Sequence, residues 1–330
     1  MRSYFDFNLK GRQIFPYVIA GWIIIAGVAV FNYFWFKSHP VPSPFFDKAF
    51  FASQAVSAVT GLLTIVASLL VVFFPVTYTI KSISLRGEGF TCEHNFRDYL
   101  WIVVKGGLLT VVTFGIYFPW LLAKVVRYFT SNTFFRYNEF RFEGSSMNLF
   151  AIMVLLIVLP AVLMSVAVSV VVLSMVTGGD PPLWLYIAFI AEFLFVAMFV
   201  SLYIKWLLNF SYGYKRITAD VNFWHSSWFL FGQMLLVVAT LGLYAPMFIL
   251  RLHRYYVGRL VLGDGIVEDK FGFSMSPWKD YFYVLGQLLL AIITVGIYGA
   301  WAYANIMTRL LSKSFVEVVE EQKIPMPGTF

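Results

Sequence analysis

Seven long apolar runs dominate the pattern of hydrophobic and polar positions along the 330-residue chain. A helix needs about 20 apolar residues to cross about 30 Å of hydrocarbon, and each run is long enough to do so. The runs cover Phe15–Phe36, Ala49–Phe74, Tyr99–Ala123, Asn148–Val176, Leu183–Leu208, Ser227–Leu250 and Tyr281–Met307. The pattern predicts an all-α polytopic membrane protein that forms a single integral membrane domain over residues 1–330.

A short motif built on Thr, Gly and Tyr interrupts three of these runs. It reads TFGIYFPW from Thr113, TLGLYAPM from Thr240 and TVGIYGAW from Thr294. The apolar arm before each motif has about 14 residues and, as a helix, rises only about 21 Å, which is short for a crossing. Glycine permits the positive φ of a reversal, and proline starts a new helix well. We therefore interpret the following residues as the tips of helical hairpins: Thr113, Gly115, Tyr117, Pro119, Trp120, Thr240, Gly242, Tyr244, Pro246, Thr294, Gly296, Tyr298 and Trp301.

The distribution of Lys and Arg distinguishes re-entrant hairpins from simple crossings. Seven simple crossings would place basic residues such as Arg136 and Lys215 outside, against the excess of basic residues expected in the cytoplasm. Three re-entrant hairpins and about four full transmembrane helices leave only Lys37 and Lys48 outside, with both termini in the cytoplasm. A kinked but continuous transmembrane helix, with the motif at its interfacial end, is the alternative.

The similarity of the three segments extends beyond the motif and predicts internal repeats at about residues 96–145, 223–272 and 277–313. Basic residues follow the tips at matched offsets, beside an aromatic residue in the first two copies. Helices that leave the membrane at headgroup depth carry such anchors. The residues expected to contact lipid headgroups are Lys124, Arg127, Tyr128, Arg251, Arg254 and Tyr255.

Short F-x-F segments occur at Phe5–Phe7, Phe140–Phe142 and Phe271–Phe273. Their alternation of aromatic and other residues indicates short cytoplasmic β-hairpin segments. Together with the repeated T-x-G-[IL]-Y-x-P-W tips, they resemble the YjgN family of bacterial inner-membrane proteins, although Met247 and Ala300 depart from the pattern of the tips. The resemblance implies an inner-membrane location and no established activity. It also implies a membrane-associated metallopeptidase as a candidate partner, because family genes often neighbour such enzymes.

Composition supports the membrane assignment and argues against several classes of function. Hydrophobic residues make up 60% of the chain and charged residues only 12%, too few to cover a soluble domain of this size. The net charge of +7 favours anionic membrane lipids as partners, and no recognition motif for nucleic acid accompanies the basic residues. Motifs for phosphate or metal binding are missing, and the four histidines are far apart in sequence. We expect no enzyme, no cofactor and no metal site.

Four polar side chains lie within predicted membrane segments, namely Lys105, Glu192, Gln233 and Gln287. A charged side chain there costs several kcal/mol unless it is paired or hydrated. We expect the four to converge on an intramembrane polar site, with Lys105 as the partner of Glu192. Interhelical hydrogen bonding is the alternative for the glutamines. Two functions stay open: translocation or binding of a small solute, ion or lipid between the broken helices, or a non-enzymatic scaffold that organises lipid or a membrane-associated peptidase.

Overall fold

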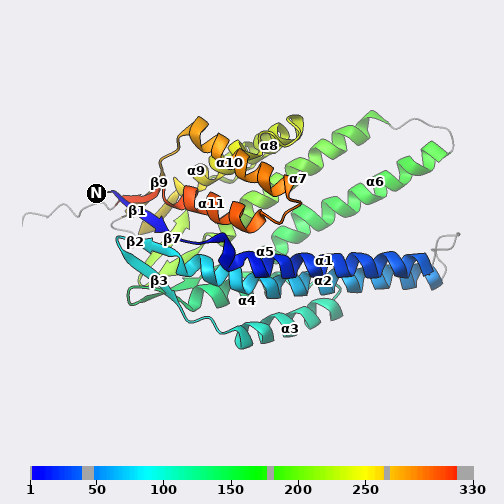
Figure 1. Cartoon of the computed structure of the whole chain (residues 1–330). Helices are drawn as coiled ribbons and strands as arrows, with labels where there is room; N and C mark the ends of the chain where they lie inside the picture. The colour runs from blue at the N-terminus through cyan, green and yellow to red at the C-terminus, as the bar shows by residue number, and fades with distance from the viewer. Residues whose placement is uncertain (1, 39–47, 177–181, 264–267, 318–330) are drawn as a thin grey trace, which may run out of the picture.

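The computed structural model describes residues 2–38, 48–176, 182–263 and 268–317 of the chain. Helices form one layer of the molecule, and short strands gather at one end of them (Figure 1). Within the described residues the chain repeats one order of elements five times: a strand, a pair of helical segments, and a second strand. Each such unit therefore returns to the end of the molecule from which it started.

The helical segments form two long hairpins and three short ones. The long hairpins are α1 (Gly11–Ser38) with α2 (Lys48–Lys81), and α5 (Ser146–Met153), the π-helical turn η1 (Val154–Val158) and α6 (Leu159–Val176) with α7 (Leu183–Leu207). The short hairpins are α3 (Phe96–Val112) with α4 (Phe118–Ser131), α8 (Phe223–Ala239) with α9 (Ala245–Val257), and α10 (Pro277–Ile293) with α11 (Gly299–Leu311). Only the long hairpins supply segments long and apolar enough to cross a membrane, and among the described residues there are four such segments.

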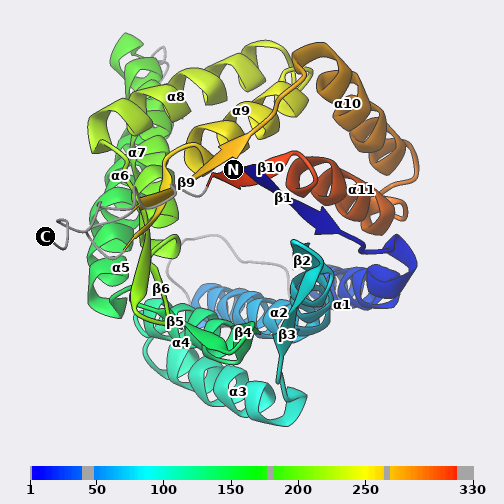
Figure 2. The same ribbon diagram turned by 90° about the vertical axis from the view of Figure 1, so that its left-hand side faces the viewer.

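Ten short strands form a closed antiparallel barrel, which Figure 2 shows end-on. The strands are β1 (Arg2–Phe7), β2 (Ile83–Leu85), β3 (Glu88–Cys92), β4 (Thr133–Phe135), β5 (Asn138–Phe142), β6 (Phe210–Tyr212), β7 (Lys215–Ala219), β8 (Leu260–Gly263), β9 (Glu268–Phe273) and β10 (Ser314–Glu317). Each strand pairs with its neighbours in sequence, and β1 also pairs with β10. This last pairing closes the barrel, so no strand edge is left unpaired.

The barrel shows that the all-α fold class predicted from the sequence is wrong. The three F-x-F segments do lie in strands, at the ends of β1, β5 and β9, but these strands belong to one barrel and not to separate small hairpins. Strands of three to six residues offer too little alternation to be recognised one at a time. The pairing of β1 with β10 also joins the two ends of the described chain, which no local pattern can indicate.

The helical segments contact one another in a closed ring above the barrel (Figure 2). The ring runs from α1 to α5 in sequence, passes to α7 and continues to α11, which contacts α1 again. Helices α4, α9 and α11 lie nearer the axis of the ring and contact strands β5, β9 and β1. At the closure a Cβ added to Gly11 would lie 2.7 Å from the Cα atom of Trp301, so only glycine allows this approach. The two ends of the described chain thus meet in both layers.

Candidate functional site

The interior of the barrel holds an apolar cavity of about 430 Å³. Because alternate residues of a strand share a face, and directly opposed residues of paired strands share it too, one set of side chains points inward. Eight strands contribute to the cavity, through Ile83, Phe90, Thr133, Phe140, Phe210, Ile217, Leu260 and Phe271. The ends of α2, α4 and α7 complete it with Ile80, Phe129, Thr130 and Leu208. This barrel cavity therefore lies against the ends of the helices.

Aromatic rings line much of this interior. The ring of Phe90 lies 4.7 Å from that of Phe135 and 5.8 Å from that of Phe140, and both pairs are stacked. The Tyr212 ring continues the row at 5.0 Å from Phe140. These contacts join strands β3 to β6, so the aromatic rings fix one another in place.

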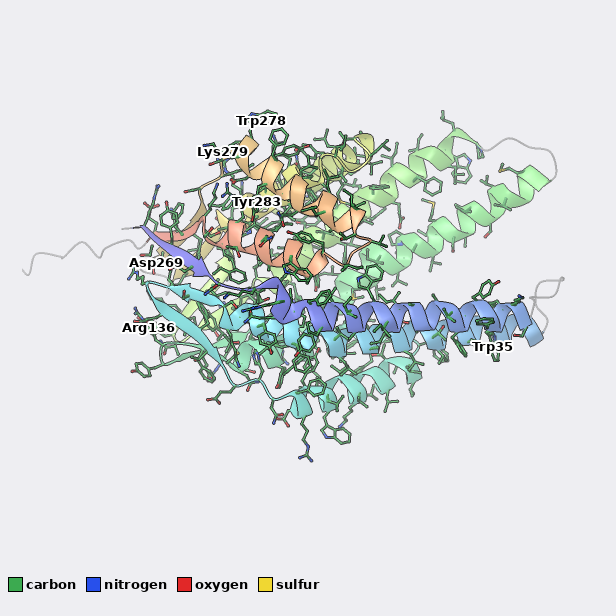
Figure 3. The ribbon with its side chains drawn as sticks, in the orientation of Figure 1. Trp35, Arg136, Asp269, Trp278, Lys279 and Tyr283 are labelled. Atoms are coloured by element: carbon green, nitrogen blue, oxygen red, sulfur yellow. The ribbon has the colours of Figure 1, made fainter. Side chains whose placement is uncertain are left out.

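Charged side chains surround the end of the barrel that points away from the helices. Arg136 forms an ion pair with Glu88, and the Lys215 Nζ atom lies 3.8 Å from the Asp269 carboxylate. Figure 3 shows Arg136 and Asp269 at this end, whereas Trp35 lies at the far end of α1. The apolar cavity is thus bounded by a polar rim on one side and by helix ends on the other.

The repeated Thr-Gly-Tyr motifs form the turns between the arms of the short hairpins. The three tip glycines, Gly115, Gly242 and Gly296, have φ values of 91°, 88° and 84°. In each tip the Thr Oγ1 atom accepts a hydrogen bond of 3.0 Å from the amide of the tyrosine four residues later. Helical hydrogen bonding therefore stops at all three glycines, as the sequence led us to expect, and the hydroxyl satisfies an amide freed by the break.

The side chains presented at the tips are apolar and almost fully exposed. The residues before the tip glycines, Phe114, Leu241 and Val295, are 95%, 95% and 78% exposed. They also adopt positive φ values of about 50°, a strained conformation for residues with a side chain. Exposure of three large apolar groups to water is unfavourable. These tips are therefore suited to contact with hydrocarbon.

The two glutamines expected at the polar site are bonded within their own hairpins. The hydroxyl of Tyr244 donates a hydrogen bond of 2.8 Å to Gln233, and that of Tyr298 donates one of 3.1 Å to Gln287. The first hairpin has no such glutamine: its tip tyrosine, Tyr117, accepts a hydrogen bond of 2.7 Å from Lys124, which lies in the same second arm. The glutamines therefore tie the two arms of a hairpin together, which is the alternative that the sequence left open.

The structure does not bring Lys105 and Glu192 together. Lys105 is exposed on α3, which contacts α2 and α4, whereas Glu192 lies in a groove between α6 and α7. Within the described part of the chain neither side chain makes an ion pair or a hydrogen bond. The expected convergence of Lys105, Glu192, Gln233 and Gln287 is not formed, because the four helices occupy different parts of the ring.

Of the six residues expected to contact lipid headgroups, the four basic ones are exposed, whereas the two tyrosines interact with other parts of the protein. Lys124, Arg127, Arg251 and Arg254 are exposed on the second arms of their hairpins. The Tyr128 hydroxyl instead bonds the backbone of Asn95, and Tyr255 is buried with its ring 3.8 Å from the Arg259 guanidinium. The two tyrosines are therefore structural and are not available to a headgroup.

The remaining tip residues pack the start of each second arm. Pro119 and Pro246 are buried in the first turns of α4 and α9. Trp120 stacks on Tyr117 with the ring centres 6.1 Å apart, and Trp301 stacks on its own tip tyrosine at 6.0 Å. These contacts orient the second arm against the turn.

Among the titratable groups buried near the barrel are His253 and Asp280. The His253 ring nitrogen lies 2.9 Å from the Ser314 hydroxyl, and burial lowers the pKa of His253 to about 4. Asp280 is fully buried, and its carboxylate accepts hydrogen bonds from Lys313 at 2.6 Å and from Arg309 at 2.8 Å. Burial by itself raises the pKa of Asp280, but these bonds and one from the Ser276 amide outweigh it, so the pKa lies below its ordinary value. Neither residue was among the site residues predicted from the sequence.

Nothing among the residues of known placement resembles a metal centre, since no three His, Cys, Asp or Glu side chains are grouped to hold an ion.

The chain matches the family described as "Bacterial protein of unknown function (DUF898)" over residues 2–275. It belongs to this family. The match runs from β1 through β9 and ends just before α10. Comparisons with curated proteins and with solved structures give no match.

Proposed function

We propose that this DUF898 protein is a non-enzymatic membrane protein that binds the acyl chain of a lipid in the barrel cavity and transfers the lipid at the membrane surface. The observation that carries the proposal is the apolar cavity lined by eight strands at the ends of the helices. Each methylene removed from water contributes about 0.8 kcal/mol, so even eight buried methylenes supply about 6 kcal/mol before the costs of association.

The chemistry of the lining favours an apolar ligand over an ion or a polar solute. Thr130 and Thr133 supply the hydroxyl groups of the cavity lining. Both hydroxyls donate to backbone oxygens of α4, that of Thr133 to Phe129 at 2.6 Å and that of Thr130 to Val126 at 3.0 Å. A polar ligand would lose its hydration without gaining partners, which costs free energy.

We further propose that the three short hairpins are re-entrant and that the barrel lies on the cytoplasmic side of the bacterial inner membrane. The exposed apolar tips support the first point, because they suit hydrocarbon and their arms are too short to cross it. The pairing of β1 with β10 supports placing both ends of the described chain on one side. Membership of the narrower YjgN group is part of the same proposal and rests on the tip and F-x-F motifs.

Photo-crosslinking with a phospholipid that carries a diazirine at the end of one acyl chain tests the proposal. Ile217 points into the cavity, so Ile217→Trp places a bulky ring in it and narrows it, while Thr91→Trp adds the same ring on the outward face of β3 as a matched control. We expect wild type and Thr91→Trp to be labelled on peptides of the barrel, and Ile217→Trp to lose most of this labelling. Equal labelling of all three proteins would contradict lipid binding in the barrel.

A scaffold that organises lipid, or that holds a membrane-associated metallopeptidase, is the second candidate function. The observation that favours it is the exposure of Phe114, Leu241 and Val295, which makes the tips suitable as wedges in one leaflet. A wedge needs these apolar tips but no open barrel. Labelling confined to tip peptides in the crosslinking experiment would therefore favour the scaffold.

A further inference from the structure

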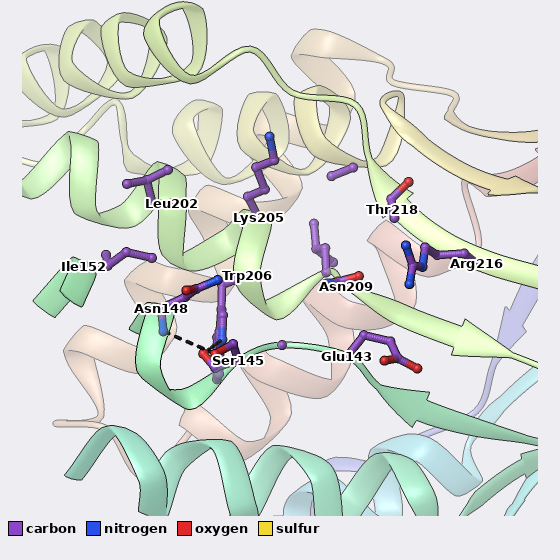
Figure 4. Close-up of a pocket in the computed structure, with 13 residues that line it drawn as sticks. Glu143, Ser145, Asn148, Ile152, Leu202, Lys205, Trp206, Asn209, Arg216 and Thr218 are labelled. Carbon is purple, nitrogen blue, oxygen red and sulfur yellow. Dashed lines mark hydrogen bonds between the residues drawn. The ribbon is translucent and has the colours of Figure 1, made fainter. Parts of the chain in front are cut away.

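A second hollow, of about 440 Å³, lies outside the barrel where α5 and α7 meet strands β5 to β7 (Figure 4). Arg216 and Thr218 line it from β7. Since Ile217 between them points into the barrel cavity, these two side chains lie on the outward face of the strand. The two hollows share only Leu208 in their linings. We call the outer one the α5–α7 pocket.

The α5–α7 pocket is lined by more positive than negative side chains. Arg216 has no hydrogen bond or ion pair to any residue of described placement, and Lys205 makes only a bond of 3.4 Å to the Val221 carbonyl oxygen. Glu143 is the single carboxylate, and it accepts from the Ser211 hydroxyl at 3.0 Å. The first turn of α5, capped by Ser145, also opens on the pocket and adds positive potential. The pocket therefore offers two cations and a helix N-terminus around one acid.

Polar and apolar lining residues occupy different levels of the pocket. Ile152 lies about two turns further along α5 than Ser145, and Leu202 about one turn before Trp206 in α7. Since both helices belong to segments able to cross a membrane, the apolar residues are on the membrane side. The Trp206 indole donates a hydrogen bond of 2.8 Å to the Ser145 carbonyl oxygen at the boundary, the level at which tryptophan is enriched in membrane proteins.

We propose that the α5–α7 pocket binds a glycerophospholipid whose headgroup carries both a phosphate and an ammonium group, as phosphatidylethanolamine does. Arg216 and Lys205 bind the phosphate through charge-assisted hydrogen bonds, for which a guanidinium is well shaped. Glu143 binds the ammonium group, and the acyl chains follow Ile152 and Leu202 toward the hydrocarbon. This site is separate from the barrel cavity and does not depend on the function proposed for it.

Native mass spectrometry of the full-length protein released from nanodiscs of equal parts phosphatidylethanolamine and phosphatidylglycerol tests the site. Arg216→Gln removes the phosphate contact, and Arg97→Gln removes an exposed arginine of α3 as the matched control. We expect Arg216→Gln to bind phospholipid in the α5–α7 pocket about tenfold more weakly, the change that loss of one charged hydrogen bond produces, and so to retain one lipid fewer than wild type, while Arg97→Gln behaves as wild type. Glu143→Gln should lower the retention of phosphatidylethanolamine and leave that of phosphatidylglycerol unchanged.

Two outcomes would overturn the proposal. Unchanged lipid retention in Arg216→Gln, with a melting temperature equal to that of wild type, would show that no headgroup is held by this arginine. Displacement of the retained lipid by excess inorganic phosphate at constant ionic strength would show a site for free phosphate instead of a lipid. Labelling of the barrel by the diazirine lipid, measured on the same variants, reports on the barrel cavity separately, so failure of one site is not confused with failure of the other.

Discussion

Acidification should destabilise this protein through His253 before most carboxylates titrate. Burial holds the pKa of His253 at about 4 in the folded protein, whereas an exposed histidine has a pKa of about 6.5. Between these values the unfolded chain binds a proton that the folded chain does not, so the free energy of unfolding falls as the pH falls. The contribution is fully present above pH 6.5 and is lost by about pH 4. At 1.36 kcal/mol for each pH unit, the loss is about 3 kcal/mol.

The assay compares wild type with His253→Gln in detergent by following tryptophan fluorescence during thermal or chemical unfolding from pH 7 to pH 4. Glutamine keeps a group able to bond the Ser314 hydroxyl but takes up no proton in this range. We expect wild type to lose about 3 kcal/mol more than the variant, with carboxylate titration common to both. His225→Gln, which changes an exposed histidine at the start of α8, is the control. Parallel pH curves for wild type and His253→Gln would refute the reasoning.

Three further predictions concern the barrel base, the tips and the closure of the ring. Asp280→Asn removes the buried carboxylate that pairs with the half-buried Arg309 and Lys313 and should cost about 3 kcal/mol, measured as a lower melting temperature at pH 7. Gly242→Ala adds a side chain at a φ of 88° and should lower the free energy of unfolding by about 1–2 kcal/mol. Gly232→Ala, in the middle of α8 where an added Cβ meets no neighbour within 4 Å, should not lower it. Gly11→Ala pushes a methyl group into the Trp301 backbone and should lower the melting temperature, with a normal melting curve as the contradicting result.

The sequence was sufficient for those parts of the fold that depend on local pattern. The interruptions at Gly115, Gly242 and Gly296 followed from a residue type that alone adopts positive φ without strain, and the structure has them. The apolar runs, once the interrupting motifs and the distribution of Lys and Arg were considered, led to about four full transmembrane helices, and the described residues contain four segments long enough to cross. The barrel was missed because its hydrogen bonds join strands from different parts of the chain, and a strand as short as Ile83–Leu85 carries almost no periodicity of its own.

The candidate site was harder to predict than the fold, for an electrostatic reason. Rare polar groups in apolar runs attract attention because each is costly in hydrocarbon, and this singled out Lys105 and Glu192. The structure places Lys105 on an exposed face and puts the enclosed space in the barrel, where Ile217 and Leu260 are ordinary strand residues. The alternation of inward and outward residues in β7 and β9 could have indicated the barrel interior. This pattern is recognisable only when the ten strands are considered together.

One position shows why five equivalent units yielded only three visible repeats. In all five units the fourth residue of the first helix is fully buried, or nearly so. Ile14, Tyr99, Leu149, Ser226 and Asp280 occupy this place. Its burial is constant, but its chemistry is not: Ile14, Tyr99 and Leu149 pack in hydrophobic clusters, Ser226 bonds Ser201, and Asp280 forms ion pairs. A buried position requires only that the side chain pack well or have its polar atoms hydrogen-bonded, and several residue types meet this requirement. The five units therefore share one structure although their residue types at this position differ.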